Sequence, residues 1–236
     1  MELFTYRQYE SSIVIVGSFY PLQFTPQWFV LNGLLPSEDE QSITVEIIYK
    51  ELTRFTLPPI SVEVTEDKLI LRSSQKQYDY LIRDLAEGIC NLRPDIAPTA
   101  MGLNVIQQIE CLNHDFWHFM GDTLVPKGFW SELIPDSPRI GLQNLQLQAN
   151  KPEEQLGYLN YSFSWSGLKN WVQLSLNNHF TNGDELREGP DRTAAKEKFD
   201  PLVILKDWEL TLKSHRNVLE GLMDKMSKEF GNGRRT

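Results

Sequence analysis

Residues Ile60 to Arg72 have the sequence Ile-Ser-Val-Glu-Val-Thr-Glu-Asp-Lys-Leu-Ile-Leu-Arg. Two aliphatic runs, Ile60–Val64 and Leu69–Arg72, flank the polar break Glu66-Asp67-Lys68. This pattern predicts a β-hairpin, because short apolar runs bounded by turn residues are typical of paired strands. The first half of the chain is therefore expected to be mostly antiparallel sheet, with two further strands at Ile13–Phe19 and Ile43–Tyr49.

A helix is expected after the hairpin, from Tyr78 to Leu92, where apolar residues recur at helical spacing before Arg93-Pro94. We expect this helix to lie across the sheet. Residues Met101 to Ile109 return to an extended pattern with Leu103, Val105 and Ile109 on the buried side.

The second half repeats this order of strands followed by a helix. Extended runs at Gly141–Ala149, Tyr158–Trp165 and Val172–Phe180 predict a meander, and the polar stretch Thr181–Lys198 predicts a long surface loop. A long amphipathic helix is expected from Phe199 to Phe230, with Asp200 as N-cap, Pro201 at its first position and Gly231 ending it.

These elements predict an α+β fold with a largely antiparallel sheet in two sheet-plus-helix halves and a long C-terminal helix. The chain has 236 residues, 41% of them hydrophobic, which is enough for one compact unit over residues 1–236. Possible halves are 1–112 and 113–236. No residue-level repeat supports a duplication, so a coincidental likeness of the halves stays open.

Charge and composition narrow the classes of partner. The net charge is −9, which disfavours nucleic acid or an anionic membrane as the main partner. No run is long and apolar enough for a membrane span, and the N-terminus lacks the pattern of a secretion signal, so a cytoplasmic protein is expected. Cys90 and Cys111 lie in apolar surroundings, where free thiols behave as small hydrophobic residues.

The segment from His114 to Trp130 carries more polar chemistry than a plain connection needs. His114 and His118 are four residues apart, the spacing by which a helix can present two metal ligands. Position 115 is Asp rather than Glu, however, and Met120-Gly121-Asp122 interrupts the apolar pattern. His179 could be a third ligand, but the prediction is that the protein binds no metal and no cofactor.

Acid–base chemistry is a second interpretation of the same region. His118, Asp122, Lys127 and His179 could form such a site if they converge in one cleft, although the sequence arranges no nucleophile beside them. In the alternative, Asp122 caps a turn, Lys127 pairs with a carboxylate, and Asn177, Asn178 and His179 satisfy the backbone of the loop that follows.

Aromatic residues are the candidates for partner binding. The segment around Trp28 and Phe29 is rich in aromatic residues and interrupted by prolines, and Trp130 closes the His-rich segment. Exposed Trp and Phe side chains would anchor a protein partner. Alternatively, these aromatic side chains are packed in the hydrophobic core.

Two segments resemble a family of bacterial proteins that has no assigned function. They are Trp117-His118-Phe119-Met120-Gly121-Asp122-Thr123-Leu124-Val125-Pro126-Lys127-Gly128-Phe129-Trp130 and Asn177-Asn178-His179-Phe180, joined by shorter matches at Gly17-Ser18-Phe19 and Gly102-Leu103-Asn104. Relatives more often have Asn-Asp-His-Tyr at the last strand, so this chain lacks a carboxylate there. The resemblance implies a bacterial protein and no activity.

The function expected from the sequence is therefore that of a non-enzymatic bacterial interaction protein, such as an accessory subunit or an antitoxin-like component of a larger complex. The acidic charge, the long terminal helix as a possible partner surface, and the lack of an assembled catalytic motif favour it. A protein partner or a homo-oligomer is expected. The alternative is a hydrolytic or nucleic-acid-processing enzyme that uses His118, Asp122, Lys127 and His179.

Overall fold

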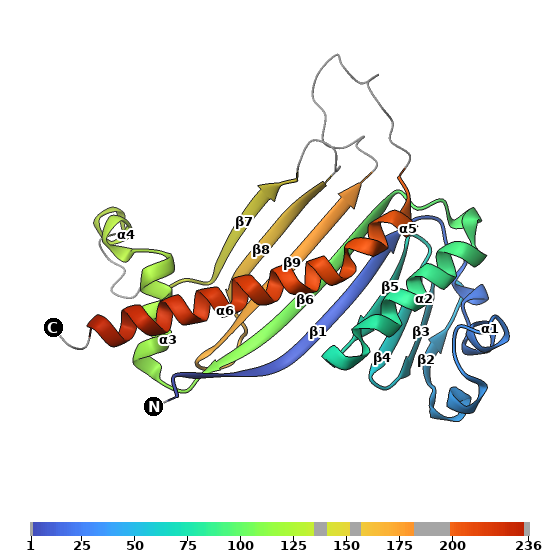
Figure 1. Cartoon of the computed structure of the whole chain (residues 1–236), viewed down its shortest axis with the longest axis horizontal. Helices are drawn as coiled ribbons and strands as arrows, with labels where there is room; N and C mark the ends of the chain where they lie inside the picture. Colours follow the sequence, from blue (N-terminus) through green and yellow to red (C-terminus); the bar gives the residue numbers. More distant parts are fainter. Residues whose placement is uncertain (1, 135–140, 152–156, 182–198, 234–236) are drawn as a thin grey trace, which may run out of the picture.

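The computed structural model describes residues 2–134, 141–151, 157–181 and 199–233. Its described strands form one antiparallel sheet of nine strands in the order β2-β3-β4-β5-β1-β6-β9-β8-β7 (Figure 1). The α+β fold with a largely antiparallel sheet is confirmed. The strands are β1 (Phe4–Val16), β2 (Thr44–Ile48), β3 (Leu52–Leu57), β4 (Ile60–Thr65), β5 (Lys68–Ser73), β6 (Ala100–Cys111), β7 (Asn144–Asn150), β8 (Gly157–Trp165) and β9 (Trp171–Thr181).

The two long helices cover the same face of this sheet (Figure 1). On this side Ser11 of β1 donates a hydrogen bond to Asp79 of α2, and Asn178 of β9 donates one to Thr211 of α6. None of the helices in the described ranges is both long and apolar enough to span a membrane. The helices are α1 (Pro26–Leu31), α2 (Asp79–Leu92), α3 (His114–Leu124), α4 (Lys127–Leu133), α5 (Pro201–Ile204) and α6 (Trp208–Gly233).

The hydrophobic core fills the space between the sheet and these helices in two clusters. The first lies under α2 and the start of the terminal helix, and includes Phe29, Phe55, Ile82 and Trp208. The second lies under the C-terminal part of α6, where residues of α3 and α6 meet the sheet. It includes Ile109, Phe116, Leu219, Met223 and Phe230.

The strand order on the two sides of the central pair of β1 and β6 is similar. Outward from β1 come β5, β4, β3 and β2, and outward from β6 come β9, β8 and β7, so β2 has no counterpart among the described strands. A helical segment follows β1 and β6, and a long helix follows β5 and β9. The order of elements thus begins again at β6, while the division into residues 1–112 and 113–236 stays a prediction.

The expected hairpin is confirmed. In β4 and β5 Val62 pairs with Leu71 and Val64 with Leu69, and all four side chains are buried. The prediction for β1 was wrong at both ends, because this strand runs from Phe4 to Val16 rather than from Ile13 to Phe19. Its polar first part alternates too weakly to be recognised and carries a bulge between Tyr6 and Tyr9.

The terminal helix begins as expected and ends later. Asp200 accepts a hydrogen bond from the Leu202 backbone N–H at 2.9 Å, and Pro201 occupies the first helical position. Helix α6 continues through Gly231 to Gly233. The surface loop expected at Thr181–Lys198 lies outside the described residues from position 182 onward.

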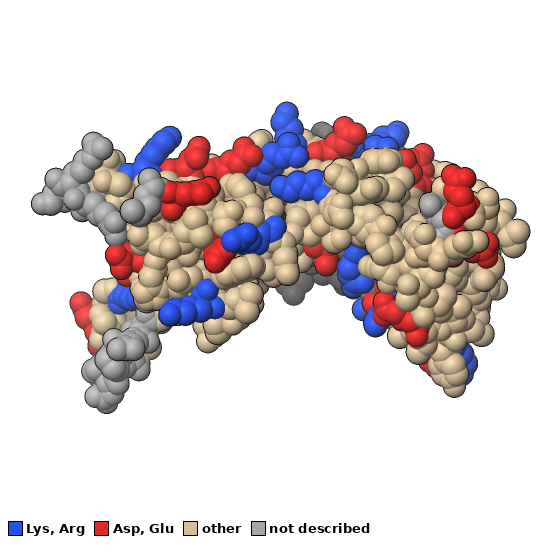
Figure 2. Space-filling view, turned by 90° about the horizontal axis from the view of Figure 1, so that it is seen from below, with Lys and Arg blue, Asp and Glu red and all other residues tan. Residues whose placement is uncertain are grey.

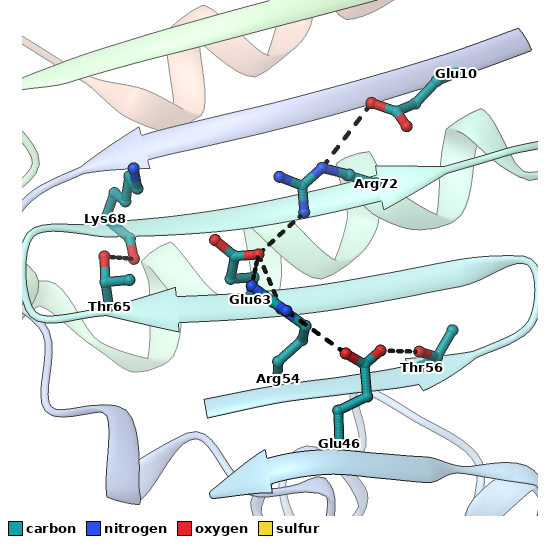
Figure 3. A network of polar contacts seen from close by, with 8 residues as sticks. All are labelled: Glu10, Glu46, Arg54, Thr56, Glu63, Thr65, Lys68 and Arg72. Carbon is teal, nitrogen blue, oxygen red and sulfur yellow. Dashed lines mark hydrogen bonds and ion pairs between the residues drawn. The ribbon is translucent and has the colours of Figure 1, made fainter. Parts of the chain in front are cut away.

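No helix of the described residues crosses the opposite face of the sheet in Figure 1, and we call this face the uncovered face. Figure 2 shows the molecule as an arch with a hollowed underside, on the side away from α6. On strands β1 to β5 this face carries a chain of ion pairs (Figure 3). Arg72 lies between Glu10 and Glu63, and Arg54 lies between Glu63 and Glu46.

Candidate functional site

The His-rich segment forms helix α3 because its first turn is capped and one side is apolar. Asn113 is the N-cap, and its side chain accepts a hydrogen bond from the Phe116 backbone N–H at 3.0 Å. Phe116 and Met120 are buried in the second core cluster. The Phe116 ring lies edge-on against Phe230 of α6, with centroids 5.3 Å apart. The polar residues of α3 lie on the opposite side of the helix.

His114 and His118 contact each other on that side. Their Nε2 atoms are 3.1 Å apart, and His114 Nδ1 lies 2.8 Å from Asn170 Oδ1 in the turn before β9. Because the amide oxygen only accepts, the His114 proton belongs on Nδ1, and His118 Nε2–H then donates to His114 Nε2. The turn before β9 therefore sets the tautomers of both rings.

Asp122 and Lys127 form an ion pair, with Lys127 Nζ 2.5 Å from Asp122 Oδ1. The side chains are 49% and 37% exposed, so this pair contributes at most about 1 kcal/mol to stability. It agrees with the architectural interpretation, in which Lys127 pairs with a carboxylate. Each of the two charges therefore has a partner of opposite sign in this structure.

These residues surround a cavity of about 520 Å³, a volume typical of small-molecule sites. The structure brings His118, Asp122 and Lys127 together at this cavity. Its walls are largely apolar, and no Ser, Thr, Cys or Tyr stands among the described residues that line it. Acid–base groups are thus present without a nucleophile. The lining residues are His114, Trp117, His118, Met120, Gly121, Asp122, Lys127, Gly141, Leu142, Phe163, Trp165 and Val172.

His179 does not belong to this cavity. It lies on β9 seven residues beyond Val172, which lines the cavity, and at about 3.3 Å per residue the two are roughly 23 Å apart. It also points to the uncovered face, where its ring stacks on Tyr158 with centroids 4.7 Å apart. The four-residue cluster that included His179 is therefore not assembled. Within the described ranges, no group of three or more His, Cys, Asp or Glu could hold a metal ion.

The partner-binding candidates separate into buried and exposed residues. Phe29 is fully buried and Trp28 is partly buried against the same core, so both serve packing. Trp130 is 43% exposed on α4, next to Phe129 at 65% and Leu133 at 61%. Helix α4 buries none of its residues. We call Phe129, Trp130 and Leu133 the α4 patch.

A polar cluster that the sequence did not reveal lies under α2 and α6. Asp79 accepts hydrogen bonds of 2.6 Å from Tyr9 and from Ser11, and its carbonyl oxygen accepts one from the Trp208 indole N–H at 2.9 Å. Burial raises the pKa of Asp79, and burial beside Asp79 raises the pKa of Tyr9. These contacts join β1, α2 and α6. The residues lie in three distant segments, so no local pattern could signal them.

His215 of α6 lies beside this cluster, and both line a small cavity of about 40 Å³. Burial lowers the pKa of His215 to about 4. The two cysteines are buried and free, and burial raises the pKa of each thiol to about 12, so neither is a nucleophile at neutral pH.

No protein-family model matches the chain, and no curated protein matches its sequence. The resemblance to a bacterial family therefore stays a prediction from the sequence.

Proposed function

We propose that the protein is a non-enzymatic interaction protein, such as an accessory subunit or an antitoxin-like component of a bacterial complex, and that the α4 patch binds its protein partner. The observation that carries this proposal is the exposure of Phe129, Trp130 and Leu133 on a helix that buries none of its own residues. Clusters of exposed large apolar side chains are found at interaction sites more often than on the rest of a protein surface.

The chemistry of α4 defines the kind of partner. Phe129 and Leu133 are four residues apart, so they lie on one side of the helix with Trp130 beside them. Side chains with this spacing suit an apolar groove on another protein. Lys127 is paired with Asp122, so we expect hydrophobic contact, rather than charge, to supply most of the affinity.

The long terminal helix does not supply this surface. Its apolar side, with Leu219, Met223, Met226 and Phe230, packs in the core against the sheet and α3. The sequence indicates the terminal helix as a possible partner surface. Because its apolar side packs against the protein's own sheet, the proposal places the partner on the α4 patch instead.

The test compares two double variants in native co-purification with mass spectrometry and light scattering. Phe129→Ala/Leu133→Ala is expected to lose a stoichiometric partner that the wild type and the control retain. The control, Leu31→Ala/Leu210→Ala, removes side chains that are 85% and 64% exposed elsewhere. Retention of the same partner by both variants would contradict the proposal, and a doubled molar mass without another protein would identify a second copy as the partner.

The alternative, a hydrolytic or nucleic-acid-processing enzyme, now rests on His118, Asp122 and Lys127 at the cavity. His118→Ala removes the histidine nearest to Asp122 along α3 and leaves the α4 patch intact. The interaction protein is expected to keep its partner in this variant. The enzyme would be supported instead if the purified wild-type protein hydrolysed a nucleic acid or an ester and the His118→Ala variant did not.

A further inference from the structure

The described sheet ends at two edge strands, β2 and β7 (Figure 1). Strand β7 pairs with β8 through all seven of its residues without a register shift. On its other side it has no neighbour among the described strands. Along such an edge, the backbone N–H and C=O groups of alternate residues point outward without a partner in the sheet. The outer side of β7 can therefore accept another strand.

The β7 edge lacks the features by which proteins usually prevent edge pairing, which are charged residues, proline, a bulge or a very short strand. Residues 141–150 contain no charged residue and no proline. Six of the seven residues of β7 are exposed, among them Leu147 at 58%. The edge is thus regular, accessible and uncharged in a chain whose net charge is −9.

Strand β2 has the protective features that β7 lacks. It is five residues long, carries a bulge between Val45 and Ile47, and has Glu46 at its centre. If two copies of β2 paired antiparallel over their full length, Glu46 would lie directly opposite the second copy's Glu46. Like charges in this position destabilise a strand pair. Pairing between two copies of the chain therefore suits the β7 edge better than the β2 edge.

The sequence of β7 is complementary to itself. In an antiparallel pair of two β7 strands centred on Leu147, residues of the same kind lie opposite each other: Gln146 and Gln148, Asn144 and Asn150, Leu145 and Ala149. Opposite residues share a face of the sheet, so carboxamides meet on the uncovered face and aliphatic side chains meet on the side of α6. Because a carboxamide both donates and accepts hydrogen bonds, two of them can bond to each other.

A pair of this kind closes on itself. The two-fold axis at Leu147 uses the same edge of both copies, so no β7 edge remains for a third copy. The joined sheet would then end at two β2 strands, where the bulge and Glu46 disfavour further pairing. The expected assembly is therefore a dimer and not a filament.

We propose that two copies of the chain associate through their β7 strands, which pair antiparallel around Leu147 and join the two sheets into one. This contact uses backbone hydrogen bonds at the edge of the sheet, whereas the α4 patch uses apolar side chains of a helix. The β7 contact does not depend on the function proposed for the α4 patch.

The first test is light scattering on the purified full chain, for which twice the molar mass of one chain is expected. Leu147→Lys and Leu147→Glu each place like charges opposite each other at the centre of the pair, so each variant is expected to be monomeric. An equimolar mixture of the two is expected to dimerise, because the new lysine then lies opposite the new glutamate. The matched control Val45→Lys, at a residue 48% exposed on the other edge strand, is expected to dimerise as the wild type does.

Disulfide trapping is a second test that does not rely on charge repulsion. In the proposed pair, Leu147→Cys places two cysteines opposite each other at a Cα distance of about 4.5–5.5 Å, which a disulfide can span. Mild oxidation is expected to link the two chains. Leu145→Cys is the control, because this residue lies opposite Ala149 of the second copy and is not expected to be linked. The native cysteines are buried.

The proposal is overturned if the wild type is monomeric, if the mixture of charged variants does not dimerise, or if Leu147→Cys is linked no better than Leu145→Cys. Loss of the dimer in Phe129→Ala/Leu133→Ala would also overturn it, since the second copy would then occupy the α4 patch. So would loss of a different protein from the co-purified material in Leu147→Lys, since a strand of that protein would then occupy the edge. A dimer that persists in Phe129→Ala/Leu133→Ala supports the β7 contact, whether or not the α4 patch binds a partner.

Discussion

His215 is a buried imidazole under α6 that the fold holds in its neutral form. Its side chain is 3% exposed, and burial lowers its pKa from 6.5 to about 4. The folded protein therefore binds this proton less tightly than the unfolded chain does. This difference contributes up to about 3 kcal/mol to the free energy of unfolding. The contribution is fully present above pH 6.5 and is lost as the pH falls toward 4.

We expect His215→Gln to remove this acid sensitivity, because glutamine can still donate to the Leu174 carbonyl oxygen but does not titrate. The free energy of unfolding, measured by urea denaturation at several pH values, should vary less between pH 6.5 and 4 in this variant. The exposed His118→Gln is the control and should behave as the wild type. An unchanged pH profile in His215→Gln would refute the assignment.

Lys151 is a second group whose charged form is disfavoured in the folded protein. Burial lowers its pKa to about 7, and its Nζ atom has no hydrogen-bond partner within the described residues. The ammonium group lies over the Phe180 ring, 2.9 Å from the centroid, a contact that favours the charged form. Burial dominates, because a ring replaces only a small part of the hydration that an ammonium group loses.

The contribution of Lys151 to the free energy of unfolding should therefore fall as the pH drops from 10.5 toward 7. We expect Lys151→Met to raise the melting temperature at pH 7, with a smaller difference from the wild type at pH 10. Differential scanning calorimetry at both pH values measures this. A lower melting temperature of the variant at pH 7 would mean that the contact with Phe180 outweighs burial.

At the scale of elements, the cap of α3 links stability to the candidate site. Asn113→Ala removes the hydrogen bond to the Phe116 backbone N–H and should cost about 1 kcal/mol of unfolding free energy. Asn113→Asp should retain most of it, since aspartate caps equally well. Urea denaturation compares the two variants, and equal losses in both would show that the cap contributes little.

Local patterns predicted the elements that have strong periodicity and missed those that depend on distant contacts. The hairpin of β4 and β5, helix α2 and the start of the terminal helix follow from spacing and caps. Strand β3 was not predicted, because its polar residues Thr53, Arg54 and Thr56 interrupt the alternation. Two of those polar groups are used in the fold: Thr53 is buried, and Arg54 pairs with Glu63 across the sheet.

The candidate site was predictable only where its residues are close in sequence. His118, Asp122 and Lys127 lie within ten residues and share one cavity. His179 is distant in sequence, and its place depends on the length and register of β9. The alternation of β9 sends Asn178 and Phe180 toward α6, and it sends Asn177 and His179 to the uncovered face, a separation that depends on pairing with β6 and β8.

At the scale of the whole molecule, one sheet divides the protein into surfaces with different tasks. One face holds the core under α2 and α6, and the uncovered face is polar and hollowed (Figure 2). Helix α4 lies outside the core clusters and exposes its apolar side chains. In the proposed account the protein is a scaffold that presents binding surfaces, and the α4 patch binds the protein partner.

The most direct test is photo-cross-linking in the cells that make the protein, with a photoreactive phenylalanine analogue in place of Phe129. The account predicts one predominant cross-linked protein from position 129, which is 65% exposed, and none of it from the control position Leu31, which is 85% exposed. No cross-linked protein from position 129, or the same products from both positions, would contradict the claim that the α4 patch binds a partner.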